Sequence, residues 1–224
     1  NEENHILISA MSGKCIRFPV TAVRVFKSRT SDGVRGIRLA DKDKVVSMSV
    51  LHGIEVDKIE KDEYLKISIK TRKKLRECTN EADVPRILKN ITVNLPIAKL
   101  LMLAAEEEFI LTLTKNGYGK RTSAYEYRVT NRGGHGIINI ITSVRNGKVV
   151  SSFPVEDNDH IMLITKKGKL IRCGVDDIRV TGRNTQGVTC RACGKDEAIV
   201  SVALISEEDS EDIDEEQETN NTSE

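Results

Sequence analysis

Arginine side chains recur in three stretches of the chain that also contain glycine or serine. The stretches, called arms 1, 2 and 3 below, are residues 24–29 (RVFKSR), 128–136 (RVTNRGGHG) and 179–187 (RVTGRNTQG). Each opens with an Arg-Val pair and carries a second arginine. A guanidinium group matches the geometry of phosphate oxygens, and small neighbouring residues let the backbone approach a polyanion. The arms therefore predict contact with phosphate groups.

Sequence patterns that are typical of catalysis are absent. Residues 116–122 (NGYGKRT) have the composition of a Walker phosphate loop but lack its first glycine at the required distance. No GxSxG or HExxH motif occurs, and the four histidines are scattered. Only four Phe, four Tyr and no Trp are present, which argues against a carbohydrate site or a base-stacking platform. We predict no catalytic residue, no metal site and no cofactor in this segment.

The chain contains three copies of one sequence pattern. The copies, units 1, 2 and 3, span residues 5–51, 109–155 and 160–205. Equivalent positions are Gly13, Gly117 and Gly168; Arg17, Arg121 and Arg172; Arg24, Arg128 and Arg179; and, after a one-residue gap, Gly33, Gly136 and Gly187. Each unit holds four short apolar runs separated by turn residues, which is typical of β-strands. Repeats of this length predict an all-β fold of propeller-like, four-stranded blades.

A longer segment separates the first two units. Gly13 and Gly117 are 104 residues apart, whereas Gly117 and Gly168 are 51 apart. The extra residues include a Lys-, Glu- and Leu-rich stretch over 62–77 and an apolar run over 97–105 preceded by proline, both typical of helices. We predict blades over 1–52, 108–156 and 157–206, a helical insertion over 53–107, and a disordered acidic tail over 207–224. Between a partner surface and a simple decoration, decoration is favoured for the insertion.

Charge is divided unevenly along the chain. Ten of the 34 acidic residues lie from Glu207 to Glu224, where no basic residue occurs, which leaves 24 acidic against 35 basic residues elsewhere. A basic body with an acidic tail predicts a polyanion partner. We hypothesise that the tail competes for the basic surface, so that removing the residues after Ser206 tightens polyanion binding. No run approaches the roughly 18 apolar residues of a membrane helix.

The candidate polyanion-binding residues are basic side chains of the arms and of positions near the hairpin turns. They are Lys14, Arg24, Lys27, Arg29, Lys120, Arg128, Arg132, Lys169, Arg179 and Arg183. An arginine that recurs at one blade position can instead bond one blade to the next. We expect that structural role for the arginines within strands, which are Arg17, Arg121 and Arg172. We favour phosphate contact for Arg132 and Arg183, which lie in glycine-rich arms.

The five cysteines are an odd number without the spacing of a disulfide framework, so we expect free thiols in a reducing compartment. Cys190 and Cys193 form a single CxxC, and a zinc site would require a second pair or matching histidines. Residues three apart on a strand point to opposite faces. We therefore expect both to pack as small apolar side chains.

Several longer phrases resemble the C-terminal domain of the DNA gyrase A subunit, namely residues 116–122 (NGYGKRT), 145–150 (RNGKVV) and 180–187 (VTGRNTQG). The resemblance covers the three units and the acidic tail, and the insertion resembles one of alphaproteobacterial gyrases. It implies a β-pinwheel, a disc of propeller-like blades that exchange strands and wrap duplex DNA around their rim. The units resemble the last three of six blades. The first-blade motif QRRGGKG is absent, and residues 131–136 (NRGGHG) partly resemble it.

The resemblance also implies the setting in which the segment works. Its partners would be duplex DNA, the B subunit of gyrase and the rest of the A subunit, in a cytoplasmic A2B2 heterotetramer that introduces negative supercoils. ATP and Mg would bind elsewhere in that enzyme. The nucleophilic tyrosine of the family follows an arginine, and none of the four tyrosines here does, so we expect a non-catalytic segment.

Three alternatives stay open. One is the C-terminal domain of the topoisomerase IV A subunit. Another is a propeller-type interaction scaffold, in which the basic residues of the arms would pair internally with acidic residues. The third is the remnant of a split or decaying gene. Because the sequence starts with Asn1 rather than Met, we expect a fragment of a longer protein.

Overall fold

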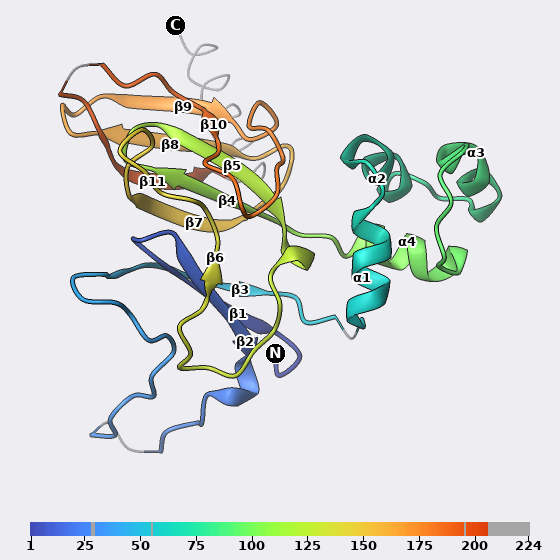
Figure 1. Ribbon diagram of the computed structural model, residues 1–224, viewed down its shortest axis with the longest axis horizontal. Coiled ribbons are helices and arrows are strands. Elements are labelled where there is room, and N and C mark those ends of the chain that lie inside the picture. The colour runs from blue at the N-terminus through green and yellow to red at the C-terminus, as the bar shows by residue number, and fades with distance from the viewer. Residues whose placement is uncertain (28–29, 55, 195, 206–224) are drawn as a thin grey trace, which may run out of the picture.

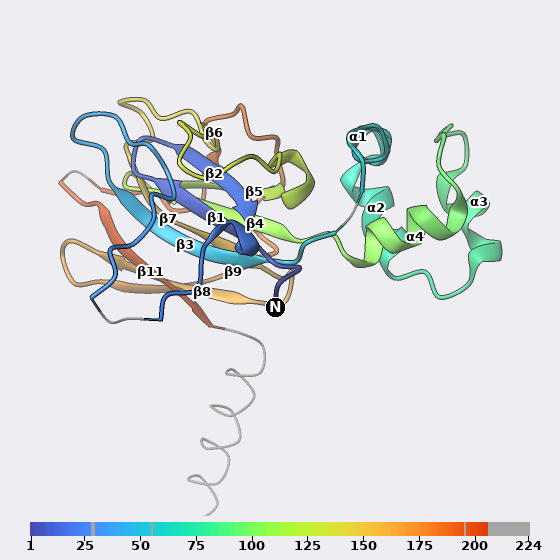
Figure 2. The same cartoon turned by 90° about the horizontal axis from the view of Figure 1, so that it is seen from below.

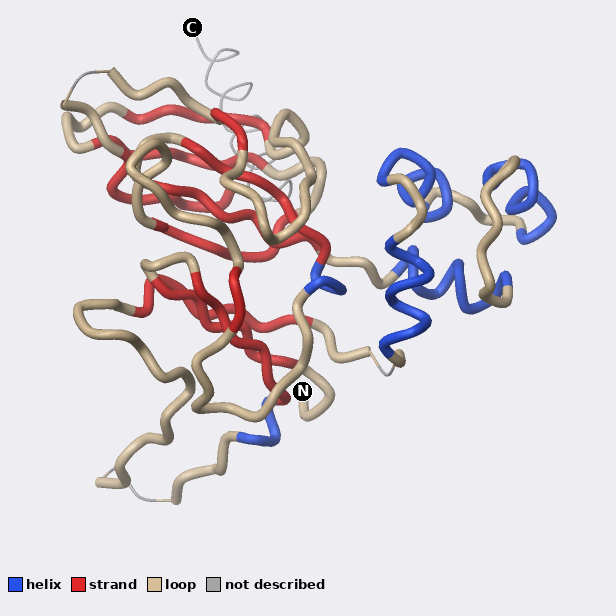
Figure 3. Tube along the Cα trace, viewed as in Figure 1, coloured by secondary structure: helices blue, strands red, loops and turns tan. Residues whose placement is uncertain are grey.

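The computed structural model describes residues 1–27, 30–54, 56–194 and 196–205. Three small antiparallel sheets pack together, and a separate lobe of helices projects from their side (Figure 1). Helix is concentrated in that lobe, whereas the sheets are joined by long loops and single helical turns (Figure 3). The predicted all-β blade architecture with a helical insertion is confirmed. The acidic tail, residues 207–224, lies outside the described residues.

Each unit begins with a hairpin and ends with a strand that returns to it. In unit 1 these strands are β1 (His5–Ala10), β2 (Lys14–Pro19) and β3 (Val45–Leu51). In unit 2 they are β4 (Phe109–Thr114), β5 (Tyr118–Ser123) and β7 (Val149–Val155). In unit 3 they are β8 (His160–Thr165), β9 (Leu170–Gly174) and β11 (Ile199–Ile205). Glycine occupies each hairpin turn because the backbone there has positive φ, 90° at Gly13 for example.

The fourth strand of a blade comes from the next unit. β6 (Ile137–Ile138) belongs to unit 2 but pairs with β2, and β10 (Val188–Thr189) belongs to unit 3 but pairs with β5. The sheet orders are therefore β3-β1-β2-β6 and β10-β5-β4-β7. Within the described residues the third sheet has three strands, in the order β11-β8-β9. Strand exchange means that each blade is completed only when the following unit is present.

The blades meet along their returning strands. β7 contacts both β3 and β11, so these three strands form the inner edges of the sheets. β6 and β10 lie at the opposite, outer edges. Leu111, Ile161, Leu163 and Ile199 are buried in one cluster that joins the second and third blades. Burial of this apolar surface holds the blades together.

The insertion is a helical lobe with its own core. Its elements are α1 (Lys58–Leu65), α2 (Ile69–Arg76), a single turn at Glu81–Asp83, α3 (Val84–Leu88) and α4 (Ile97–Ala105). The helix predicted over 97–105 is confirmed. The stretch 62–77 holds parts of two helices, because the Ser68 side chain accepts a hydrogen bond from the backbone N–H of Thr71 and starts a new one. Among the described residues, none of the helices is long and apolar enough to cross a membrane.

Candidate nucleic-acid interface

The segments that carry the arms run side by side along the outer edges of the blades. The backbone N–H of Gly133 in arm 2 donates to the carbonyl of Gly36, 2.6 Å away and seven residues beyond the end of arm 1. The backbone N–H of Ile141, just beyond arm 2, donates to the carbonyl of Thr185 in arm 3 at 2.9 Å. Successive units therefore place their arms next to one another. Figure 2 shows the loops that carry arms 2 and 3, around β6 and near β5, on one side of the sheets.

Six of the ten candidate residues are exposed cations. They are Lys14, Arg24, Lys27, Arg128, Lys169 and Arg179, and they are called the outer cations below. The Arg24 guanidinium lies 4.7 Å from the centre of the Phe26 ring, and Lys169 pairs with Glu197 at 3.4 Å. The side chains of the other four form no ion pair with a described acidic residue. Arg29 lies outside the described residues. Apart from Lys169, the outer cations are thus available to an external anion.

Lys120 requires a correction, because its side chain is fully buried. Its ammonium group donates to the carbonyls of Gly182 and Arg183, at 2.7 Å each. Burial lowers the pKa of Lys120 to about 7. A group so enclosed is inaccessible to a phosphate and instead anchors arm 3 to β5. The repeat indicates this burial, because Lys120 stands where the other units have the apolar residues Ile16 and Ile171.

Arg132 and Arg183 also bind backbone of the neighbouring unit. Arg132 donates from Nε to the carbonyl of Ala22 at 2.8 Å and from Nη1 to that of Arg35 at 3.1 Å. Arg183 donates from Nε to the carbonyl of Glu126 at 2.8 Å, and its Nη1 donates to Ile138. Both side chains are half-buried. They hold one arm segment against the next, which is the structural role expected of the strand arginines.

Arg17 and Arg121 are buried, and their side chains form hydrogen bonds between blades, as predicted. Arg17 donates to the carbonyls of Ala124, at 2.8 Å, and His52, at 2.9 Å, and its Nε donates to Nδ1 of His5 at 3.2 Å. Burial, together with the charge of Arg17, lowers the pKa of His5 to about 4. His5 is therefore neutral and accepts the hydrogen bond at neutral pH.

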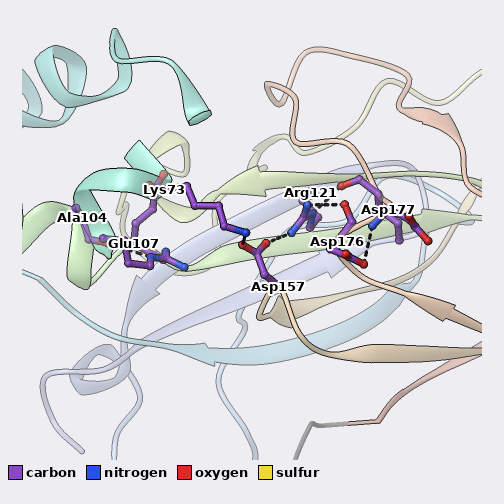
Figure 4. A network of polar contacts seen from close by, with 9 residues as sticks. Lys73, Ala104, Glu107, Arg121, Asp157, Asp176 and Asp177 are labelled. Atoms are coloured by element: carbon purple, nitrogen blue, oxygen red, sulfur yellow. Dashed lines mark hydrogen bonds and ion pairs between the residues drawn. The ribbon is translucent and has the colours of Figure 1, made fainter. Parts of the chain in front are cut away.

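Arg121 also bonds to two carbonyls at the second junction, with a carboxylate in place of the histidine (Figure 4). Its Nε donates to the carbonyl of Ile178 at 2.7 Å, and its Nη2 donates to that of Asp176 at 3.1 Å. Nη1 pairs with the carboxylate of Asp157, which also accepts from Lys73 on α2 at 2.9 Å. These two hydrogen bonds outweigh burial and keep the pKa of Asp157 below its usual value. The side chain of Asp157 therefore links α2 of the insertion to β5.

Arg172 does not follow its two counterparts. Its side chain is exposed and bonds to no described residue. Arg17 and Arg121 also pair through their backbones with the Val of the next arm, Val129 and Val180. No described unit follows unit 3, so Arg172 has no such arm to bind. The predicted structural role of Arg172 is thus wrong for this chain.

Cys190 and Cys193 lie beyond β10, which ends at Thr189, so the argument from opposite strand faces does not apply to them. Both pack against the apolar cluster that joins the second and third blades. Burial raises the pKa of Cys190 to about 12. Their side chains act as half-buried apolar groups at this junction, as expected from the sequence.

The comparison with family models identifies all three units. A model described as DNA gyrase C-terminal domain, beta-propeller, matches residues 4–52, 108–156 and 159–206. The gaps between the matched segments coincide with the insertion and with the short link between units 2 and 3. The matched part is more than half of the chain.

Curated relatives extend the match across the insertion. The DNA gyrase A subunit of Rickettsia bellii is 49% identical over 92% of this chain and 22% of its own length. The same subunit of Granulibacter bethesdensis is 41% identical over 94% of this chain and 23% of its own length. The chain thus spans under a quarter of the length of these relatives.

A solved structure shares the fold at lower identity. The C-terminal domain of DNA topoisomerase IV superposes with a TM-score of 0.63 at 18% identity, covering 97% of this chain and 51% of that chain. An identity this low supports the blade architecture alone.

Proposed function

Because the chain belongs to the DNA gyrase C-terminal domain family, we propose that it binds duplex DNA along the outer edges of its blades. The observation that carries the proposal is the line of adjoining arm segments, which carry four of the outer cations, with the other two, Lys14 and Lys169, beside hairpin turns. Such cations contact phosphate oxygens and release condensed counterions, which gives affinity without base recognition. The buried arginines and Lys120 hold the arms in place and do not themselves touch DNA.

We further propose that the segment works as the DNA-binding and DNA-wrapping C-terminal part of a gyrase A subunit. Its partners are then the B subunit of gyrase and the rest of the A subunit in a cytoplasmic A2B2 enzyme that introduces negative supercoils. The segment supplies no chemistry of its own, and ATP and Mg belong elsewhere in that enzyme. In support, Tyr64, Tyr125 and Tyr127 are buried, and burial raises the pKa of each hydroxyl. Tyr118, the fourth, accepts a hydrogen bond from Arg145 at 3.3 Å.

The test is duplex binding by a variant that lacks two outer cations, Arg128→Ala/Arg179→Ala. The control is Lys58→Ala/Arg86→Ala, which removes two exposed cations from α1 and α3 of the insertion. Each lost phosphate contact lowers the salt slope of log K by about 0.9. We expect a slope shallower by about 2 for the arm variant and no change for the control. If both double variants changed the salt slope equally, or if the unmodified chain did not bind duplex DNA, the interaction scaffold would be favoured.

A further inference from the structure

The helical insertion is fixed to the blades. The Tyr125 ring of unit 2 is part of the insertion core, its centre 5.7 Å from that of Tyr64, and its hydroxyl donates to the carbonyl of Leu103 at 2.8 Å. The guanidinium of Arg76 on α2 lies 5.3 Å from the centre of the Phe109 ring on β4. Lys73 of α2 pairs with Asp157, which lies in the link between units 2 and 3. A lobe held both by unit 2 and by the link between units 2 and 3 keeps its surface at a set position relative to the outer cations.

The two faces of α2 differ in burial. Arg72 and Leu75 are buried, and Arg72 pairs with Glu107. Lys70 and Lys74 are four residues apart, which places them on one face of a helix, turned away from the buried pair. Both are exposed, and neither bonds to any residue in the described ranges. The eight residues of α2 contain no acidic side chain to neutralise them.

The basic helix adjoins arm 3. Ile69 and Lys73 of α2 line one hollow together with Val180, which directly follows the outer cation Arg179. Figure 4 shows the ion pairs at this hollow, in which the Asp157 carboxylate is held between Lys73 and Arg121. Two further acidic residues of the hollow are Glu107, paired with Arg72, and Asp176, whose carboxylate accepts from the backbone N–H of Asp177 at 3.0 Å.

Acidic side chains that form no ion pair with any described residue gather at a different hollow. Glu106, Glu108, Glu156 and Asp159 line it, beside the chain that links the insertion to β4. A polyanion is repelled there, and it is attracted where α2 meets arm 3. Charge therefore selects the side of the insertion that duplex DNA can approach.

We infer that the insertion is a second DNA-binding surface, in which Lys70 and Lys74 of α2 contact backbone phosphates of the duplex that lies on arm 3. The inference rests on the proposed function, because it extends the same duplex beyond the outer cations. The acidic tail of the chain is the competing occupant of this surface, and the experiment below separates the two.

The experiment measures duplex binding by the full chain across a salt series. The test variant is Lys70→Glu/Lys74→Glu, and the matched control is Lys58→Glu/Arg86→Glu, which changes the total charge equally at exposed positions of α1 and α3. We expect the test variant to bind about tenfold more weakly at 0.1 M salt, with a slope shallower by about 2. Circular dichroism of both variants verifies the fold.

Three outcomes are decisive. Equal weakening by test and control variants would overturn the inference, because it would reflect total charge rather than contact. If the test variant binds normally while Arg128→Ala/Arg179→Ala weakens binding, the inference fails and the proposed function stands. The measurement is repeated with the ten acidic residues of 207–224 changed to Gln or Asn. An effect of Lys70→Glu/Lys74→Glu that vanishes in this background would show that α2 binds the tail instead of DNA.

Discussion

One arginine position of the repeat is buried at a blade junction in unit 2, as Arg121, and exposed in unit 3, as Arg172. The same substitution at both residues therefore measures how much the buried arginine stabilises the junction. Arg121→Met removes a buried guanidinium that donates to Ile178, Asp176 and Asp157. Arg172→Met makes the same change in the equivalent residue of unit 3, which bonds to no described residue. Methionine is similar in length and carries no charge, so packing is largely retained.

The expected loss at Arg121 follows from the groups that it leaves behind. The carbonyls of buried Ile178 and exposed Asp176 both lose a charged donor, and hydrogen bonds to charged groups each contribute about 1.5–3 kcal/mol. Asp157 keeps Lys73, so its carboxylate is not left unpaired. We expect Arg121→Met to reduce the free energy of unfolding by about 3–5 kcal/mol. Arg172→Met should stay within about 0.5 kcal/mol, as for most exposed substitutions.

Urea denaturation followed by far-UV circular dichroism measures both variants beside the unmodified chain. Each 1 kcal/mol corresponds to about 2–4 °C in melting temperature for a domain of this size, so Arg121→Met should melt on the order of 10 °C lower. Equal losses at Arg121 and Arg172 would refute the reasoning. So would a loss below about 1 kcal/mol at Arg121, since the buried bonds would then contribute little to the junction.

Two further predictions concern buried positions. The pKa of Lys120 is about 7 in the folded chain and 10.5 in a free lysine. Between these two pH values unfolding takes up a proton, so the free energy of unfolding rises with pH by up to about 1.4 kcal/mol per pH unit. Lys120→Met should remove this dependence on pH, and an unchanged dependence in urea denaturation from pH 7 to pH 10 would contradict the lowered pKa of Lys120. Gly117→Ala should lower the free energy of unfolding by more than about 2 kcal/mol. The reason is that φ of Gly117 is +81° and the added Cβ would lie 2.0 Å from the carbonyl oxygen of Arg191. A melting temperature equal to that of the unmodified chain would contradict this prediction, because the turn would then relax freely.

The internal repeat made the blades predictable, since apolar runs and turn glycines recur at equivalent positions. It could not show which blade a short strand joins, because a two-residue strand such as Ile137–Ile138 has no pattern of its own. The destination of β6 depends on contacts with a unit more than 100 residues earlier, at Lys14 and Cys15.

The candidate site was predictable in part for the same reason. Arginine in a glycine-rich arm suits a phosphate, and it suits a backbone carbonyl of a neighbouring arm equally well. Arg132 proved to bind carbonyls at Ala22 and Arg35, about a hundred residues away in sequence. The Lys73–Asp157 pair that fixes the insertion was missed, because no local spacing connects α2 with the loop before β8.

The central claim is that the outer cations bind duplex DNA through its phosphates, and the salt dependence of binding tests it most directly. Affinity for a duplex of arbitrary sequence is measured across a salt series, with and without residues 207–224. Contacts from all six outer cations would give a slope of log K against log salt of about −5, and we expect tighter binding once the acidic tail is removed. A folded chain that fails to bind in either form, or that binds with an affinity independent of salt, would contradict the claim.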